Sequence, residues 1–280
     1  MSNVTFGQYY PAASPVHRLD PRTKVVGAIA YIVAAFLCKN TLSFALLLLS
    51  AFGLILLSRI PVRIVMRSLR ALLLVLVFTA VLNIFWAVDT AEGAVPLFEW
   101  GFITIYAKGF YNAAFIVVRI FCMVIGTSVF LTYTTSPIAL TDAIESLLYP
   151  LTLIKINVHT FAMMMTIALR FIPTIMEETE KIMAAQKARG ADFTTGSLAK
   201  RARALVPIIV PLFASAFRRA DELATAMECR CYHGGKGRTK LRVLRFRLRD
   251  AVALLVVAVL ITGIVLINVY CARHGWLYTM

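Results

Sequence analysis

The chain has 280 residues, of which 60% are hydrophobic and only 15% are charged, and its mean hydropathy is +0.80. Soluble domains contain about 45 to 50% apolar residues, so this composition excludes a soluble globular protein and predicts an integral membrane protein. The net charge of +15 does not indicate nucleic-acid binding, because the basic residues form runs beside apolar stretches, where anionic membrane lipid attracts them.

The first 24 residues are polar and rich in proline, and no basic run precedes the first apolar stretch. We therefore expect 1–24 to be a cytoplasmic segment and not a cleaved signal peptide. Asp20 and Arg22, in the sequence HRLDPRTK, are expected to cap the first helix. The alternative is that they contact a later cytoplasmic domain.

Five apolar stretches are candidates for crossing a bilayer, which takes about 20 residues. The first four are 25–38, 41–57, 71–88 and 110–131, which together make a transmembrane segment 25–131. The fifth is 251–271, and it belongs to a last segment, 251–280, that includes the C-terminus. Lysine and arginine number three in 1–24, four in 58–70 and eighteen in 132–250. The positive-inside rule then predicts a multi-pass protein of the cell membrane with its N-terminus in the cytoplasm and its C-terminus outside.

Arg119 lies inside the fourth of these stretches. A charged residue at the bilayer centre costs about 2.5 to 3.5 kcal/mol on insertion scales, so we expect it to face the bundle interior or a protein partner. A bond to a helix carbonyl is the structural interpretation, and a counter-ion for a transported solute is the functional one.

The segment 132–250 is interrupted by prolines and charges, and we interpret it as a cytoplasmic or interfacial domain and not as further spans. Apolar residues from Phe161 to Met183 keep a helical spacing, with a kink expected at Pro173. A second helix is expected from about Leu198 to Cys229. Residues 241–250 are predicted to form a basic helical face that carries Arg242, Arg245 and Arg249.

Each of the two predicted long helices ends in an arginine followed by a turn. The first end reads AAQKARGADF and the second AMECRCYHGG, and their arginines, Arg189 and Arg230, are 41 residues apart. Gly190 suits the left-handed position beyond a helix end, and Arg189 suits the negative end of the helix dipole. These ends are therefore either ordinary C-caps or two arginines presented to a partner. Antiparallel helices of this length would cross and could carry both tips toward the cytoplasm.

The sequences SPVHRLDPRTK (14–24), AQKARGADF (185–193) and AMECRCYHGG (226–235) resemble the transmembrane T component of energy-coupling factor (ECF) vitamin transporters over nearly the whole chain. This resemblance implies an all-α polytopic protein whose crossed coupling helices dock into two ABC-type ATPases. The docking residues it implies are Ala188, Arg189, Gly190, Cys229, Arg230 and Cys231. The cysteines depart from the family pattern, which has a small residue before the second arginine and Gly or Ser after it.

The resemblance also implies the other partners. A membrane-embedded S component would bind the vitamin or metal. This S component could bind to an adaptable apolar surface of the chain. The surface would be formed by Phe161, Met164, Met165 and Ile172, although the same residues could instead form a core between the long helices. The chain itself would bind no cofactor and would not be an enzyme, because ATP and Mg²⁺ would belong to the ATPases.

Other interpretations have weaker support in the sequence. Cys229, Cys231 and His233 have neither the cysteine spacing nor the fourth ligand of a zinc site, so we predict no metal. GGKGRT (234–239) lacks the spacing of a phosphate-binding loop. Since no catalytic constellation is evident, a lipid-modifying enzyme is a remote alternative. The principal alternative to the ECF subunit is a stand-alone secondary permease.

Overall fold

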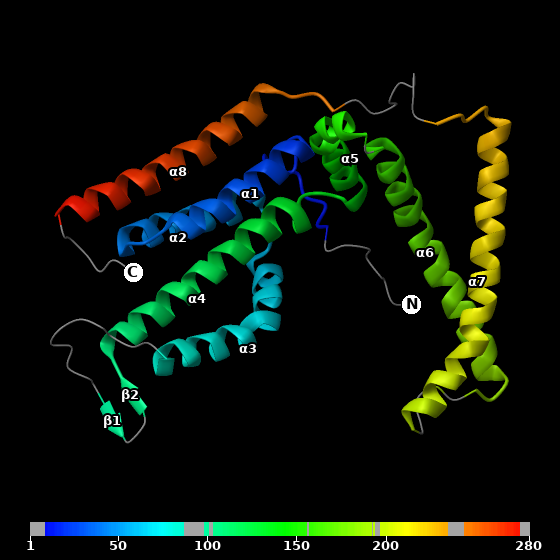
Figure 1. Cartoon of the computed structure of the whole chain (residues 1–280), viewed down its shortest axis with the longest axis horizontal. Coiled ribbons are helices and arrows are strands. Elements are labelled where there is room, and N and C mark those ends of the chain that lie inside the picture. Colours follow the sequence, from blue (N-terminus) through cyan, green and yellow to red (C-terminus); the bar gives the residue numbers. More distant parts are fainter. Residues whose placement is uncertain are drawn as a thin grey trace. The chain divides into compact units, whose positions relative to one another are not determined.

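The computed structural model describes residues 9–86, 98–100, 103–155, 157–191, 193, 197–234 and 244–274 (Figure 1). These residues are mainly helical, which confirms the predicted all-α class. The α-helices are α1 (Pro21–Leu37), α2 (Thr41–Ser58), α3 (Val62–Trp86), α4 (Ala107–Thr127), α5 (Pro137–Leu148), α6 (Val158–Ala188), α7 (Leu198–Cys229) and α8 (Leu248–His274). A π-helical segment, Ser128–Tyr133, continues α4, and a 3₁₀ segment, Tyr149–Ile154, follows α5.

A small hairpin precedes α4 and was not predicted from the sequence. Strand β1 (Phe98–Trp100) pairs antiparallel with β2 (Ile103–Ile105), with Phe98 opposite Ile105 and Trp100 opposite Ile103. Each strand has only three residues, so the alternation that marks a strand is too short to be recognised.

The chain divides into two compact units, which we describe separately: a bundle unit, 1–143 with 244–280, and a long-helix unit, 144–243. The domain boundaries predicted from the sequence, 132–250 for the non-spanning part, are close to this division without coinciding with it. In the bundle unit, α4 packs against α1, α2 and α3, and α8 packs against α1 and α2. Its core is built around Tyr31, Leu47, Ile125, Tyr133 and Ile264, each at most 2% exposed.

The first helix begins as the sequence predicted. The Asp20 carboxylate accepts a hydrogen bond from the backbone N–H of Arg22 at 2.9 Å, and Pro21 occupies the first helical position. The neighbouring contacts join this helix start to the rest of the bundle. The buried Lys24 ammonium donates to the carbonyl oxygen of Thr134 at 2.7 Å, and the Asp20 N–H donates to the Asp250 carboxylate at 2.7 Å.

Five helical segments are long and apolar enough to cross a membrane: Thr41–Ser58, Gly109–Tyr133, Pro137–Ile154, Val158–Ala188 and Leu248–Arg273. The sequence also predicted five spans, but only three of them, 41–57, 110–131 and 251–271, correspond to segments in this set. Helix α1 has 17 residues, and the apolar part of α3 is limited to Leu72–Phe85. By length and composition, 132–250 thus holds two apolar helical segments that were not among the predicted spans. Pro137 starts a helix and Pro173 lies inside α6, so neither proline prevents an apolar helix of this length. That 132–250 is a cytoplasmic or interfacial domain stays a prediction.

The approach to α8 also differs from the sequence prediction. Residues 244–247 are not helical, and α8 begins only at Leu248. Arg245 and Arg249 therefore do not share a helical face as expected, and Arg242 lies outside the described residues. The reason is local: the Asp250 carboxylate accepts a hydrogen bond from the Arg247 N–H at 2.8 Å and so begins the helix there.

Candidate functional site

The long-helix unit carries both arginine motifs at helix ends. Helix α6 ends at Ala188 and α7 ends at Cys229, as predicted, and both helices continue through their internal prolines. The side chains of Ala188, Arg189, Cys229 and Arg230 are exposed, as are Gly190 and Cys231. The predicted docking residues are therefore accessible in this chain.

The end of α6 is a complete Schellman cap. Gly190 has φ of +84°, its N–H donates to the Lys187 carbonyl at 2.9 Å, and the Ala191 N–H donates to the Gln186 carbonyl at 3.0 Å. Arg189 is the last residue before the chain turns away. The prediction that Gly190 occupies the left-handed position is confirmed.

The end of α7 repeats this geometry without a glycine. Cys231 has φ of +55°, its N–H donates to the Glu228 carbonyl at 2.8 Å, and the Tyr232 N–H donates to the Met227 carbonyl at 3.0 Å. Arg230 thus has the same place in its cap as Arg189. The departure from the family pattern at this site changes the residue but not the backbone.

An ion pair joins the two long helices and was not anticipated from the sequence. Arg219 Nη2 of α7 donates to Glu178 Oε2 of α6 at 3.0 Å. Arg189 follows Glu178 by 11 residues, and Arg230 follows Arg219 by the same number. Because 11 residues make about three helical turns, each motif arginine lies on the face of its helix that carries the ion pair, about 16 Å beyond it.

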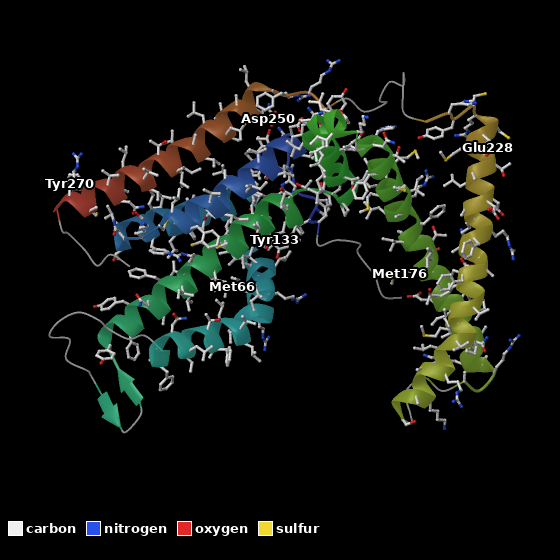
Figure 2. The ribbon with its side chains drawn as sticks, viewed as in Figure 1. Met66, Tyr133, Met176, Glu228, Asp250 and Tyr270 are labelled. Carbon is white, nitrogen blue, oxygen red and sulfur yellow. The ribbon has the colours of Figure 1, made fainter. Side chains whose placement is uncertain are left out.

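The two arginine tips lie at opposite ends of this helix pair. Helices α6 and α7 are joined by the short segment after Gly190 and run in opposite directions, with Glu228 near the far end of α7 (Figures 1 and 2). Arg189 is therefore at the end where the chain turns and Arg230 at the end remote from it. From the two rises of about 16 Å, the tips are separated by roughly 30 Å. The arrangement has approximate twofold symmetry about the ion pair.

An apolar groove of about 320 Å³ lies between α6 and α7 on the Arg230 side of the ion pair. Its walls include Ile167 and Phe171 of α6 and Ala220, Leu223 and Met227 of α7. The α7 residues recur at helical spacing, which is the signal by which the sequence could have revealed this contact.

The predicted apolar surface lies on the first turns of α6. Phe161, Met164 and Met165 are exposed, at 52%, 55% and 40%, and Ile172 is half-buried. The alternative that these four residues form a core between the long helices is therefore not supported for the first three. They present an open apolar strip.

The remaining candidate groups have structural partners. Arg119 Nη2 donates to the Cys38 carbonyl at 2.9 Å, and its guanidinium lies 5.3 Å from the centre of the Phe44 ring. The prediction of a bundle-facing arginine bonded to a helix carbonyl is confirmed. His159 pairs with Glu145 at 3.0 Å, and the His233 ring nitrogen Nδ1 donates to the Cys231 carbonyl at 3.0 Å. Within the described residues, His, Cys, Asp and Glu form no group of three that could hold a metal ion.

The family model described as cobalt transport protein (CbiQ) matches residues 12–241. A protein of Thermosediminibacter oceani named energy-coupling factor transporter transmembrane protein EcfT is 48% identical over 99% of this chain and 100% of its own length. The proteins of that name from Ruminiclostridium cellulolyticum and Bacillus subtilis are each 46% identical, over 95% and 93% of this chain and 97% and 98% of their own lengths.

The chain belongs to the EcfT family. The family model includes the whole of α6 and α7 with their arginine caps, and the match to the Thermosediminibacter oceani protein covers nearly the whole chain. An EcfT-family chain is a transmembrane subunit of an energy-coupling factor transporter, so the resemblance proposed from the sequence is confirmed at this level.

Proposed function

We propose that this chain is the non-catalytic energy-coupling subunit of an ATP-driven micronutrient importer, and that Arg189 and Arg230 are its two ATPase-docking residues. The observation that carries the proposal is the pair of equivalent exposed arginine caps placed symmetrically about the Glu178–Arg219 ion pair. A pair of related ATPase subunits would present two equivalent grooves, and the two equivalent tips supply one arginine for each.

An arginine at a helix end suits a joint that transmits force. Its planar guanidinium can form several hydrogen bonds to carboxylates or backbone carbonyls in fixed geometry, and the Schellman cap orients the residue that carries it. When ATP draws the ATPases together, the tips of α6 and α7 would move with their grooves. The ATP and Mg²⁺ for this step belong to the partner subunits.

The moving load would be a membrane-embedded S component that binds the vitamin or metal. The exposed strip of Phe161, Met164 and Met165, with Ile172 beside it, is the surface that we assign to this partner. Methionine side chains adapt to more than one apolar surface, and an exposed apolar patch marks a contact with a protein or with the membrane. We further propose that the five segments predicted from the sequence are the ones that cross the membrane and that α6 and α7 stay on its cytoplasmic side. The lysine and arginine distribution then places the N-terminus in the cytoplasm and the C-terminus outside.

The test is copurification of the tagged full-length chain from its native membrane. We expect two ATPase chains and one small membrane protein per tagged chain. Arg189→Ala and Arg230→Ala should each reduce the retained ATPase by about tenfold or more, because truncating one partner of a buried charge pair costs about 2 to 5 kcal/mol. Arg189→Lys should restore it only partly, since an ammonium cannot make the bidentate contact.

Arg218→Ala is the matched control, because Arg218 is an exposed arginine in the middle of α7, more than three helical turns from Arg230, and it should leave the retained ATPase unchanged. Undiminished ATPase retention in the double alanine variant would refute the docking assignment. Recovery of the chain alone, with solute uptake intact, would support the secondary permease instead.

A further inference from the structure

A second apolar groove, in the bundle unit, has features of a lipid site. It has a volume of about 430 Å³ and lies between the starts of α1 and α8 and the end of α2. Its walls include Leu19 and Gly27 on the α1 side, Leu57 of α2 and Val256 of α8. Leu57 and Val256 are 55% and 58% exposed and belong to two of the helices that are long and apolar enough to cross a membrane, so lipid acyl chains are the natural covering for this wall.

Two polar features interrupt the apolar wall. Thr23 lines the groove and is 4% exposed, yet its hydroxyl oxygen has no hydrogen-bond partner among the described residues. A buried hydroxyl without a hydrogen-bond partner is destabilising, so a ligand that offers an acceptor there would be stabilised. Arg249 also lines the groove, and its side chain is exposed.

The rim near Arg249 is positively charged. Arg245 and Arg247 precede α8, and Arg59 caps α2 two residues after Leu57; all three are exposed. The carboxylate next to Arg249 belongs to Asp250, which is buried and accepts hydrogen bonds from the backbone N–H groups of Asp20 and Arg247 (Figure 2). The four exposed arginines outnumber this one buried carboxylate, so the rim keeps a net positive charge.

From these features we infer that the groove between α1, α2 and α8 binds one anionic glycerophospholipid. An acyl chain would lie against Gly27 and Val256, an ester carbonyl would accept a hydrogen bond from the Thr23 hydroxyl, and the headgroup phosphate would meet Arg249. The order of features along the groove, apolar wall, neutral donor and cation, is the order of groups along such a lipid. The site does not depend on the proposed docking of ATPases.

The test is native mass spectrometry of the full-length chain in detergent, titrated with phosphatidylglycerol or with phosphatidylcholine of the same acyl chains. We expect one phosphatidylglycerol to bind about tenfold more tightly than phosphatidylcholine, since each arginine near a membrane surface contributes about 1 kcal/mol toward anionic lipid. Arg249→Gln should remove about fivefold of this preference, whereas Arg245→Gln, outside the groove wall, should change it less.

Two further variants separate the parts of the site. Thr23→Val keeps the shape and removes the hydroxyl, so it should weaken both lipids alike by about threefold. Ala253→Trp places an indole in the groove and should abolish tight binding of both lipids. Ala258→Trp is the matched control, because Ala258 is an exposed residue of α8 outside the groove wall, and it should have no effect.

Three outcomes would overturn the assignment. Equal affinity for the two lipids would show that the groove does not select an anionic headgroup. Persistence of the bound lipid in Ala253→Trp would place it elsewhere on the protein. Loss of the lipid when the chain is assembled with its copurifying subunits would assign the groove to a protein partner.

Discussion

At the scale of single residues, the two arginine caps show that one backbone geometry is reached with different residues. Gly190 takes the left-handed conformation without a steric penalty, whereas Cys231 takes it with a side chain attached. The cap of α7 is therefore retained at a cost that the cap of α6 does not have.

This difference predicts that Cys231→Gly stabilises the protein. The left-handed conformation costs a non-glycine residue about 1 kcal/mol, so the substitution should raise the free energy of unfolding by about that amount. The midpoint of thermal unfolding of the purified chain in detergent measures it. Gly190→Ala is the reciprocal change and should lower the midpoint. A marked loss of stability or of ATPase retention in Cys231→Gly would show that the thiol has a task of its own.

The position of Arg119 inside an apolar helix is also explained by contacts of a single residue. Its guanidinium satisfies the Cys38 carbonyl at the end of α1 and lies over Phe44. A helix end inside a bundle needs such a donor, because the last carbonyls of a helix have no partner within it. The contact explains a charge inside an apolar stretch without a transported solute, which removes the main residue on which the permease interpretation depended.

At the scale of elements, the sequence predicts helices best where apolar periodicity runs without interruption. Helices α2, α4, α7 and α8 lie close to their predicted ranges, and α7 begins and ends at the predicted residues. The caps were also predictable at Asp20 and Gly190, because Asp and Gly have strong local preferences.

The remaining elements depend on contacts that local patterns do not encode. The cap at Cys231 contradicts local propensity, and the Glu178–Arg219 pair joins residues 41 positions apart. The start of α8 is set by the Asp250 carboxylate, which also accepts from an N–H group 230 residues earlier. A sequence pattern can place a charge on a helix but cannot identify a partner that far away.

The same carboxylate gives a prediction at this scale. Asp250→Ala would leave the N–H groups of Asp20 and Arg247 without their acceptor and should lower the free energy of unfolding by about 2 to 4 kcal/mol. Asp250→Asn keeps one oxygen acceptor and should cost about half as much. Thermal unfolding of the detergent-solubilised chain measures both. Asp221→Ala, an exposed site on α7, should be nearly neutral, and an equally small effect of Asp250→Ala would contradict this account of how α8 begins.

At the scale of the whole molecule, the two units distribute their polar groups differently. The bundle unit buries Lys24 and Asp250 in specific hydrogen bonds, and the long-helix unit leaves its arginine tips exposed. Buried and bonded groups fix a scaffold, whereas exposed groups on rigid caps remain available to partners. This contrast fits the proposed function, in which the exposed tips dock to ATPases and the bundle unit acts as the scaffold.

The cysteines offer a test of that division on the native sequence. Cys229 and Cys231 are exposed on either side of Arg230, whereas Cys38, Cys122 and Cys271 are buried. A maleimide should therefore label two of the five thiols of the folded chain, as measured by intact mass. If Arg230 docks into an ATPase groove, both thiols should be protected in the assembled complex.

The tip of α6 needs an introduced reporter for the same measurement. Ala188→Cys, in a chain that also carries Cys229→Ser and Cys231→Gly, places a single exposed thiol beside Arg189. If one ATPase docks at each tip, the complex should protect this thiol from labelling to the same degree as it protects Cys229 and Cys231 in the native sequence. Protection at one tip only would mean that a single ATPase engages the chain, and equal labelling of free and assembled protein at both tips would show that neither arginine lies in an interface.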